Sequence, residues 1–285
     1  MISLKGVTKT FKRTTVLNGI NLEFAAGDRV ALIGSNGAGK TTLIRCLLGE
    51  YQFEGSISLN GENPRENRKA VLERIGFVPQ LPPPLKMPVQ QLLNFSAGVC
   101  GCSTDEMKAV AAQLGLDLEP LYKRPFEKLS GGQKQKLLIS IALGRPTSLL
   151  IMDEPAANLD PEARHTLFSL LEKKQEESAM LISSHRLDEV ASLVNRVIEL
   201  DRGKVVLDDR VDDSIDLSSL LNCNLTTTRI EPAFSKAIGS WGFSAGADET
   251  QWSGTIPGPD RLRFLGTLSR YAALLAAVEI KEAKQ

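Results

Sequence analysis

Residues Gly34-Ser35-Asn36-Gly37-Ala38-Gly39-Lys40-Thr41 decide the fold, because they spell the phosphate-binding pattern G-x-x-x-x-G-K-[ST]. The strand-like run 29–33 precedes this stretch and the helix-like run 42–48 follows it, a context that separates a phosphate loop from a chance glycine-rich turn. Glycines let the backbone wrap around a phosphate chain, and the N–H groups of the loop and of the helix start attract the anion. We expect Lys40 to reach the β- and γ-phosphates and the Thr41 hydroxyl to bind Mg²⁺.

The composition limits the possible classes of function. The chain has 285 residues, with 34 Lys+Arg and 34 Asp+Glu, so that its formal net charge is +0. This length suits one large domain and a smaller one. The neutral balance argues against a nucleic-acid binder, which normally carries a basic excess. No run approaches the ~18 apolar residues of a membrane span, and the N-terminus lacks a signal-peptide pattern, so we expect a cytoplasmic protein that reaches a membrane only through a partner.

The four cysteines, Cys46, Cys100, Cys102 and Cys223, are scattered along the chain. This usage is typical of a reducing compartment. Cys100-Gly101-Cys102 is either half of a soft-metal site or, since no His or second Cys pair lies near it in the sequence, a pair of ordinary thiols.

Two buried strands are expected to end in residues that can do chemistry. The run 149–154 is typical of a fully buried parallel strand, and it ends in the neighbouring carboxylates Asp153 and Glu154. Open α/β sheets bind their ligands at this end of the strands, so we expect Asp153 to help hold Mg²⁺ and Glu154 to act as a general base for water. The run 179–183 leads to His185, which either senses the γ-phosphate or is a structural histidine.

Two single residues each allow two interpretations. Gln80 ends the short strand-like run 75–80, and it either binds Mg²⁺ or positions the attacking water, or it is an ordinary loop residue. Phe11 lies between the alternating runs 2–7 and 16–24, which predict antiparallel strands. Its ring either stacks on adenine or packs in the core of the hairpin.

A helical insert and a second anion-binding pattern follow. The runs 89–99 and 104–114 have helical spacing with no strand between them, and they form either a docking surface or a packing layer. Leu129-Ser130-Gly131-Gly132-Gln133 then precedes the helical run 134–143, with Ser130 as its N-cap. This glycine-rich helix start exposes N–H groups to an anion, so the chain has a second phosphate site besides the loop 34–41. One nucleotide does not need both sites, which suggests that the second site binds the nucleotide of a neighbouring molecule.

Taken in order, these motifs resemble those of the ATP-binding subunit of ABC transporters, over about residues 1–208. The matching segments are the Walker A loop (34–41), the Q-loop Gln80, the signature LSGGQ (129–133), Walker B (149–153), the catalytic Glu154, the D-loop (158–160) and the switch His185. Phe11 stands where the family has an adenine-stacking aromatic residue, usually Tyr, and Ala156 stands where Thr is common. The resemblance implies an α/β P-loop NTPase domain with an antiparallel β subdomain and a helical subdomain at about residues 81–145.

The resemblance further implies an ATPase that uses Mg²⁺, works as a homodimer around two ATP molecules, and drives a separate transmembrane permease from the inner face of the cell membrane. The implied catalytic residues are Glu154, His185, Gln80 and Lys40. The implied Mg²⁺ ligands are Thr41, Gln80 and Asp153. The implied nucleotide contacts are Phe11, Gly34, Ser35, Asn36, Gly37, Ala38, Gly39, Lys40, Thr41, Thr42 and Asp160, together with Ser130, Gly131, Gly132 and Gln133 of the other copy.

The chain beyond about Asp208 is not covered by the resemblance. We expect a linker at 209–222 and a small α+β domain at 223–285, whose segments read β-α-β-β-α-β as in a ferredoxin-like fold. This domain is a regulatory ligand sensor, a dimerisation or docking module, or a packing extension without a ligand.

Two other classes of function compete with transport. A non-transport ABC-type ATPase of the translation type carries two cassettes in one chain, whereas each motif occurs once here, and the DNA-repair type inserts a long coiled coil where this chain has only residues 76–129. A small P-loop kinase has no use for the segment 129–133 or for Glu154 beside Asp153. A transport ATPase subunit is therefore favoured over a regulatory non-transport ATPase, and nothing in the sequence indicates the cargo or the direction of transport.

Overall fold

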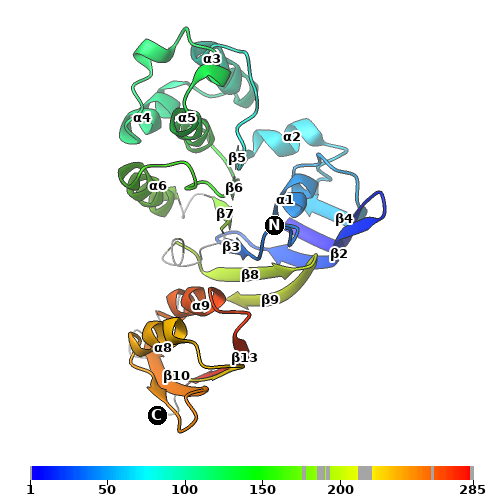
Figure 1. The fold of residues 1–285 in the computed structure, drawn as a ribbon. Helices are drawn as coiled ribbons and strands as arrows, with labels where there is room; N and C mark the ends of the chain where they lie inside the picture. The colour runs from blue at the N-terminus through cyan, green and yellow to red at the C-terminus, as the bar shows by residue number, and fades with distance from the viewer. Residues whose placement is uncertain are drawn as a thin grey trace. The chain divides into compact units, whose positions relative to one another are not determined.

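The computed structural model describes residues 2–174, 178–184, 190, 193–210, 220–257 and 260–282. The chain divides into two compact units (Figure 1), Met1–His185 with Arg196–Asp209, and Arg186–Asn195 with Arg210–Gln285. Each unit contains a hydrophobic core of its own.

The first unit is built around a six-stranded sheet with the strand order β5-β6-β7-β3-β8-β9. Its strands are β3 (Arg29–Ile33), β5 (Ile75–Val78), β6 (Leu149–Asp153), β7 (Ala179–Ser183), β8 (Arg196–Asp201) and β9 (Lys204–Arg210). Neighbours from β5 to β8 pair in parallel, and β6 is buried at every position, as its continuous apolar sequence predicts. Parallel pairing brings the carboxyl ends of β3, β5, β6 and β7 to one edge of the sheet, which positions the site described below.

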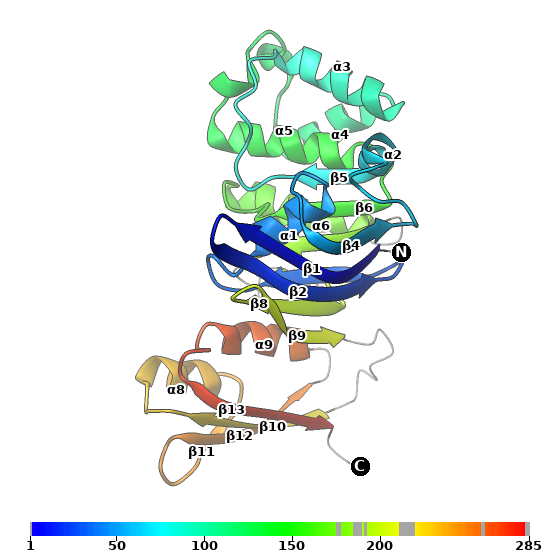
Figure 2. The same ribbon diagram turned by 90° about the vertical axis from the view of Figure 1, so that its right-hand side faces the viewer.

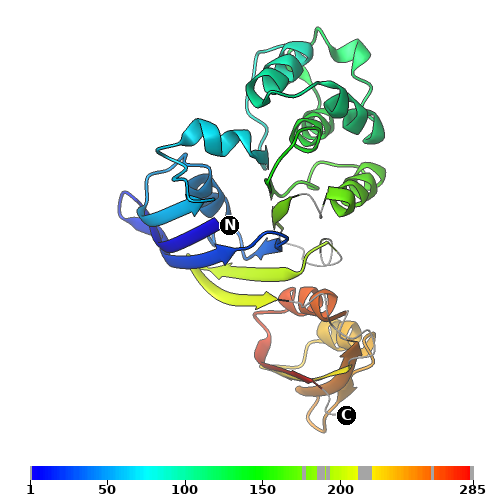
Figure 3. The same cartoon turned by 180° about the vertical axis from the view of Figure 1, so that it is seen from behind.

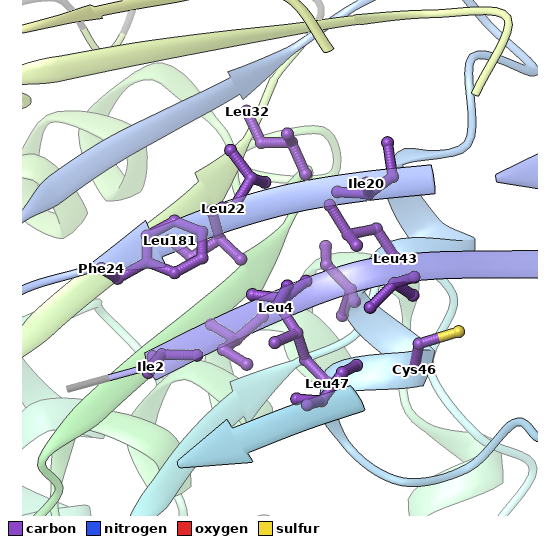
Figure 4. Packing of buried hydrophobic residues seen from close by; sticks show 14 of the residues in the cluster. Ile2, Leu4, Ile20, Leu22, Phe24, Leu32, Leu43, Cys46, Leu47 and Leu181 are labelled. Carbon is purple, nitrogen blue, oxygen red and sulfur yellow. The ribbon is translucent and has the colours of Figure 1, made fainter. Parts of the chain in front are cut away.

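A second, antiparallel sheet has the order β2-β1-β4, with β1 at Ile2–Phe11, β2 at Thr14–Phe24 and β4 at Glu54–Leu59. The helix α1 (Lys40–Leu47) packs against both sheets in one apolar cluster. Figure 4 shows Leu43 and Leu47 of α1 close to Leu4 and Ile20 of the antiparallel sheet, with Leu32 of β3 in the same cluster. Full burial of such a side chain contributes about 1.5–3 kcal/mol, so the helix that follows the phosphate loop is firmly anchored.

The helical part of the first unit has a separate apolar cluster that includes Leu93, Met107, Phe126 and Leu137. Its helices are α3 (Val89–Cys100), α4 (Asp105–Gln113) and α5 (Gly131–Leu143). Along the chain, α2 (Arg68–Glu73) precedes β5, and α6 (Pro161–Lys174) lies between β6 and β7. Figures 1 and 3 show α3, α4 and α5 grouped together, apart from β1, β2 and β4. The helices predicted at 89–99 and 104–114 are confirmed to within one residue. None of the helices in the described ranges has both the length and the apolar character needed to cross a bilayer.

The second unit contains a four-stranded antiparallel sheet in the order β11-β12-β10-β13. Its elements are β10 (Leu220–Thr227), α8 (Pro232–Gly239), β11 (Ser244–Ala245), β12 (Gln251–Pro257), α9 (Arg261–Ser269) and β13 (Leu275–Glu282), which gives the order β-α-β-β-α-β. Figure 2 shows α8 and α9 on one face of this sheet, where Phe234 and Phe264 join its core. The strand β10 starts before the expected domain boundary at 223, because Leu221 continues the alternation of buried residues in that strand.

Candidate active site

The glycines of the phosphate loop have conformations that other residues cannot adopt without strain. Gly34 directly follows β3 with φ 147°, and a Cβ at this position would overlap the carbonyl oxygen of Leu200. Gly39, the residue before α1, has φ 111°, and a Cβ there would lie 2.8 Å from Cδ2 of Leu17. Within the described residues, no side chain caps the start of α1, and the first N–H groups of a helix attract anions.

The Lys40 side chain lies across the loop and is only 8% exposed. Its Nζ donates hydrogen bonds to the carbonyl oxygens of Gly34 (2.6 Å) and Ser35 (3.3 Å). Burial lowers the pKa of Lys40, while the nearby charges of Glu154 and Asp153 act in the opposite direction. A bound phosphate chain would add to the negative charge near this ammonium and so favour its charged form.

The Thr41 hydroxyl and the carboxylate of Asp153 meet at the tip of β6. Thr41 Oγ1 donates to Asp153 Oδ2 at 2.8 Å, and Asp153 is only 2% exposed. These adjacent oxygens fit Mg²⁺, which prefers hard oxygen ligands and is usually held by one or two carboxylates together with substrate phosphates. The described residues contain no group of three or more His, Cys, Asp and Glu side chains that could hold a metal ion.

Ser183, at the tip of β7, fixes both acidic residues. Its Oγ donates to Asp153 Oδ1 and accepts from the N–H of Glu154 at 3.1 Å, and this N–H also approaches the Ser183 carbonyl oxygen at 3.2 Å. Glu154 has φ 51°, a left-handed conformation that is rare outside glycine and that clusters at functional sites. Ser183 was not among the predicted site residues, because its place beside Asp153 depends on the parallel register of β6 and β7, which only the structure shows.

Most of the predicted nucleotide residues line one cleft. It has a volume of about 470 Å³ and is lined by residues 35–42, Gln80, Asp153 and Glu154, with Val16 as an unpredicted member. Small-molecule sites typically measure about 300–1,000 Å³. Gln80, which is exposed at the end of β5, therefore lies with the loop and with the acidic pair.

Phe11 does not belong to the described residues that line this cleft. The residue is 39% exposed, and its ring packs edge-on against Tyr51, with 5.2 Å between the ring centroids. Lys9 Nζ lies 4.6 Å from the centre of the Phe11 ring. The ring is thus accessible for stacking, and its contact with adenine stays a prediction.

The signature segment also lies outside the lining of the cleft within the described chain. Ser130 caps α5 through a capping box, in which Ser130 Oγ accepts from the N–H of Gln133 (3.2 Å) and Gln133 Oε1 accepts from the N–H of Ser130 (3.0 Å). Ser130 and Gly131 are exposed. Asp160, another predicted nucleotide contact, instead pairs with Lys136 at 2.9 Å.

The remaining predicted residues are either outside the described chain or without a metal-like arrangement. His185 lies outside the described residues. Cys100 and Cys102 are free thiols, and Cys100 Sγ accepts a hydrogen bond from Arg145 Nη1 at 2.6 Å. Burial raises the pKa of Cys102.

The phosphate loop and the acidic strand tip share one cleft, an arrangement that defines a P-loop nucleoside triphosphatase. The family model described as ABC transporter matches residues 17–157. The chain is 34% identical over 236 residues to the lantibiotic transport ATP-binding protein SrtF of Streptococcus pyogenes, covering 78% of this chain and 96% of the relative. It is 32% identical over 220 residues to the glutamine transport ATP-binding protein GlnQ of Escherichia coli K12, covering 73% and 90% of the two chains. The chain therefore belongs to the ABC transporter family.

A solved structure supports the same assignment. The ATP-binding subunit of an ABC transporter matches the chain with a TM-score of 0.68 and 27% identity, covering 75% of this chain and 91% of that chain. The resemblance inferred from the motifs and the predicted P-loop ATPase fold are thus confirmed. The chain is an ATP-binding subunit with an ATPase activity coupled to transport.

Proposed function

We propose that two copies of this chain enclose two ATP molecules, and that ATP binding and hydrolysis close and reopen the dimer to drive a separate permease. One observation carries the proposal. The cleft of a single chain gathers the phosphate loop, Gln80, Asp153 and Glu154, while the glycine-rich helix start at Ser130 lies exposed outside it. An exposed helix start attracts anions, so it suits the nucleotide held by the other copy.

In this proposal each side chain has a stated task. Lys40 and the loop N–H groups bind the β- and γ-phosphates, and the oxygens of Thr41, Asp153 and Gln80 hold Mg²⁺. When bound, Mg²⁺ neutralises charge that develops on the phosphates. Glu154 orients the attacking water and accepts its proton.

Three further parts belong to the proposal. His185 would sense the γ-phosphate, Phe11 would stack on adenine, and Asp160 would act near the nucleotide at the dimer seam. The small α+β domain at 223–285 would serve regulation or dimerisation.

The permease and the location follow from the family rather than from the cleft. The two relatives named above transport a lantibiotic and glutamine, which differ in chemistry, so the proposal names no cargo. We place the chain in the cytoplasm, on the inner face of the cell membrane and attached through its permease.

The Glu154→Gln variant tests the catalytic role. It should bind ATP, lose phosphate release, and form a stable dimer in ATP, because the carboxylate that accepts the proton is gone while the phosphate contacts remain. Size-exclusion chromatography and a phosphate-release assay measure both effects. Glu172→Gln on the exposed side of α6 is the matched control. Undiminished hydrolysis by Glu154→Gln would remove Glu154 from its role.

A mixing experiment tests the shared site. The Ser130→Arg chain should bind nucleotide in its own cleft and lose hydrolysis, and the Lys40→Ala chain should lose activity through its phosphate loop. A heterodimer of the two keeps one intact site, made of the loop from the first chain and the helix start from the second. Activity should therefore return on mixing. Inactive heterodimers, demonstrated with two affinity tags, would count against sharing.

A further inference from the structure

Two successive side chains of α5 are bonded to the loop that leaves Glu154. Gln135 Nε2 donates to the carbonyl oxygen of Pro155 at 3.0 Å, and Lys136 Nζ pairs with Asp160 Oδ2 at 2.9 Å. The two ends of the segment 155–160 are thus attached to the helix whose first residues form the signature. Near the middle, a Cβ built on Gly132 would lie 3.3 Å from the Asn158 carbonyl oxygen, so the helix and the loop are in close contact.

The Gln135 amide lowers the stability of the fold at this position. The residue is fully buried, and Gln135 Oε1 has no hydrogen-bond partner among the described residues. A methionine would fill the same space without leaving a buried oxygen unpaired. Because the amide is a poor choice for stability, its bond to Pro155 is better explained by positioning.

The Lys136–Asp160 pair connects a third element. Asp160 Oδ1 accepts from the N–H of Ala163 at 2.8 Å, so Asp160 also fixes the start of α6. The Ala163 N–H and the Lys136 ammonium both lower the pKa of Asp160. Asp160 is 52% exposed, and ion pairs this exposed contribute little to stability. Its contribution is the alignment of α5 with α6.

We propose that Gln135 and Lys136 are positioning residues that couple the two ATP sites of a dimer. The inference rests on the proposed function, in which the start of α5 contacts the partner's nucleotide while Glu154 acts on the nucleotide of its own chain. The helix α5 has 13 residues, and in this proposal it shifts as a rigid body. A shift of α5 pulls on Pro155, the residue next to Glu154, and so reorients the Glu154 carboxylate.

The variants Gln135→Met and Lys136→Met test the coupling in the full chain. Nucleotide affinity should stay unchanged, because neither residue lines the cleft within the described chain. The kcat for ATP should fall about 10- to 100-fold, as expected for a catalytic group displaced by about 1 Å, and the Hill coefficient for ATP should fall toward that of independent sites. Lys108→Met is the matched control, since it removes another exposed ion pair in the helical part of the first unit, the one between Lys108 and Asp105 at 3.8 Å. This control should change neither the kcat nor the Hill coefficient.

A double-mutant cycle separates the contact from a general disturbance. Asp160→Asn keeps an oxygen for the Ala163 N–H and removes the charge that Lys136 binds. If the pair carries the effect, Lys136→Met with Asp160→Asn should lose no more turnover than either single change. Losses that simply multiply, or variants that lower Tm and leave kcat and the Hill coefficient unchanged, would overturn the inference.

The two proposals fail in different ways. If Glu154→Gln does not dimerise in ATP, the shared-site function is wrong and the coupling falls with it. If Glu154→Gln dimerises in ATP while Lys136→Met and Gln135→Met keep the wild-type kcat and Hill coefficient, the shared-site function stands and only the coupling is wrong.

Discussion

Replacing Ser183 by alanine removes one hydroxyl that serves two residues of the site. Ser183 Oγ donates to Asp153 Oδ1 and accepts from the Glu154 N–H at 3.1 Å. The Glu154 N–H keeps the Ser183 carbonyl oxygen as a partner at 3.2 Å. The main loss therefore falls on Asp153, whose buried carboxylate retains the hydroxyl of Thr41 as a donor and loses the hydroxyl of Ser183.

The expected size of the effect follows from the loss of one hydrogen bond to the charged carboxylate of Asp153. A hydrogen bond to a charged group contributes about 1.5–3 kcal/mol, so Ser183→Ala should lower the free energy of unfolding of the first unit by about 2 kcal/mol. At about 2–4 °C per kcal/mol for a domain of this size, Tm should fall by about 4–8 °C. Asp153 would also be less well oriented as a metal ligand, and loss of such support typically costs about 10- to 100-fold in metal affinity.

Thermal unfolding and the Mg²⁺ dependence of phosphate release measure the two effects. Ser140→Ala is the matched control, because Ser140 is equally buried, but among the described residues its hydroxyl donates to the Lys136 carbonyl oxygen of the same helix, α5, and not to a residue of the site. Alanine is the better helix former and removes a bond that competes with the helix, so this control should be nearly neutral. Equal losses of Tm in the two variants, or an unchanged Mg²⁺ requirement in Ser183→Ala, would refute the reasoning.

Three further outcomes are expected. Gly34→Ala should destabilise the nucleotide-free chain by more than Gly37→Ala, as urea unfolding would show, because both have positive φ but only the Cβ at Gly34 meets a backbone carbonyl oxygen. Between the lowered pKa of folded Lys40 and the ordinary pKa of the unfolded chain, the unfolded state binds the extra proton, so stability should rise with pH. ATP affinity, measured by calorimetry, should fall over the same alkaline window, and Lys40→Met should flatten both slopes. Arg196→Met should cost about 3–5 kcal/mol in urea unfolding, because it leaves the buried Asp28 without the guanidinium at 3.0 Å; a loss below 1 kcal/mol would contradict this.

The local features could be predicted because neighbouring residues make them. The phosphate loop needs only the conformations of consecutive residues, such as Gly34 and Gly39, and the strand and helix on either side. The capping of α5 by Ser130 likewise depends on a window of four residues. The predicted loop, both insert helices and the helix start at Ser130 are all present in the structure.

Less could be predicted for single residues, because the type and position of a residue do not determine which side chains it contacts. Phe11 was placed by its order in the chain, but only the packing revealed its edge-on contact with Tyr51. Val16 lines the cleft, although no motif in its own segment of the sequence predicted this.

The sequence by itself determined the family, the phosphate loop and the carboxylates at the end of β6, since each is written in a short run of residues. Only the tertiary structure decided that Thr41 meets Asp153, 112 residues further along the chain, that Ser183 holds the acidic pair, and that Gln135 is bonded to Pro155. The reason is physical: these contacts cross between elements, and the order β5-β6-β7-β3 that brings them together results from the packing of the whole unit.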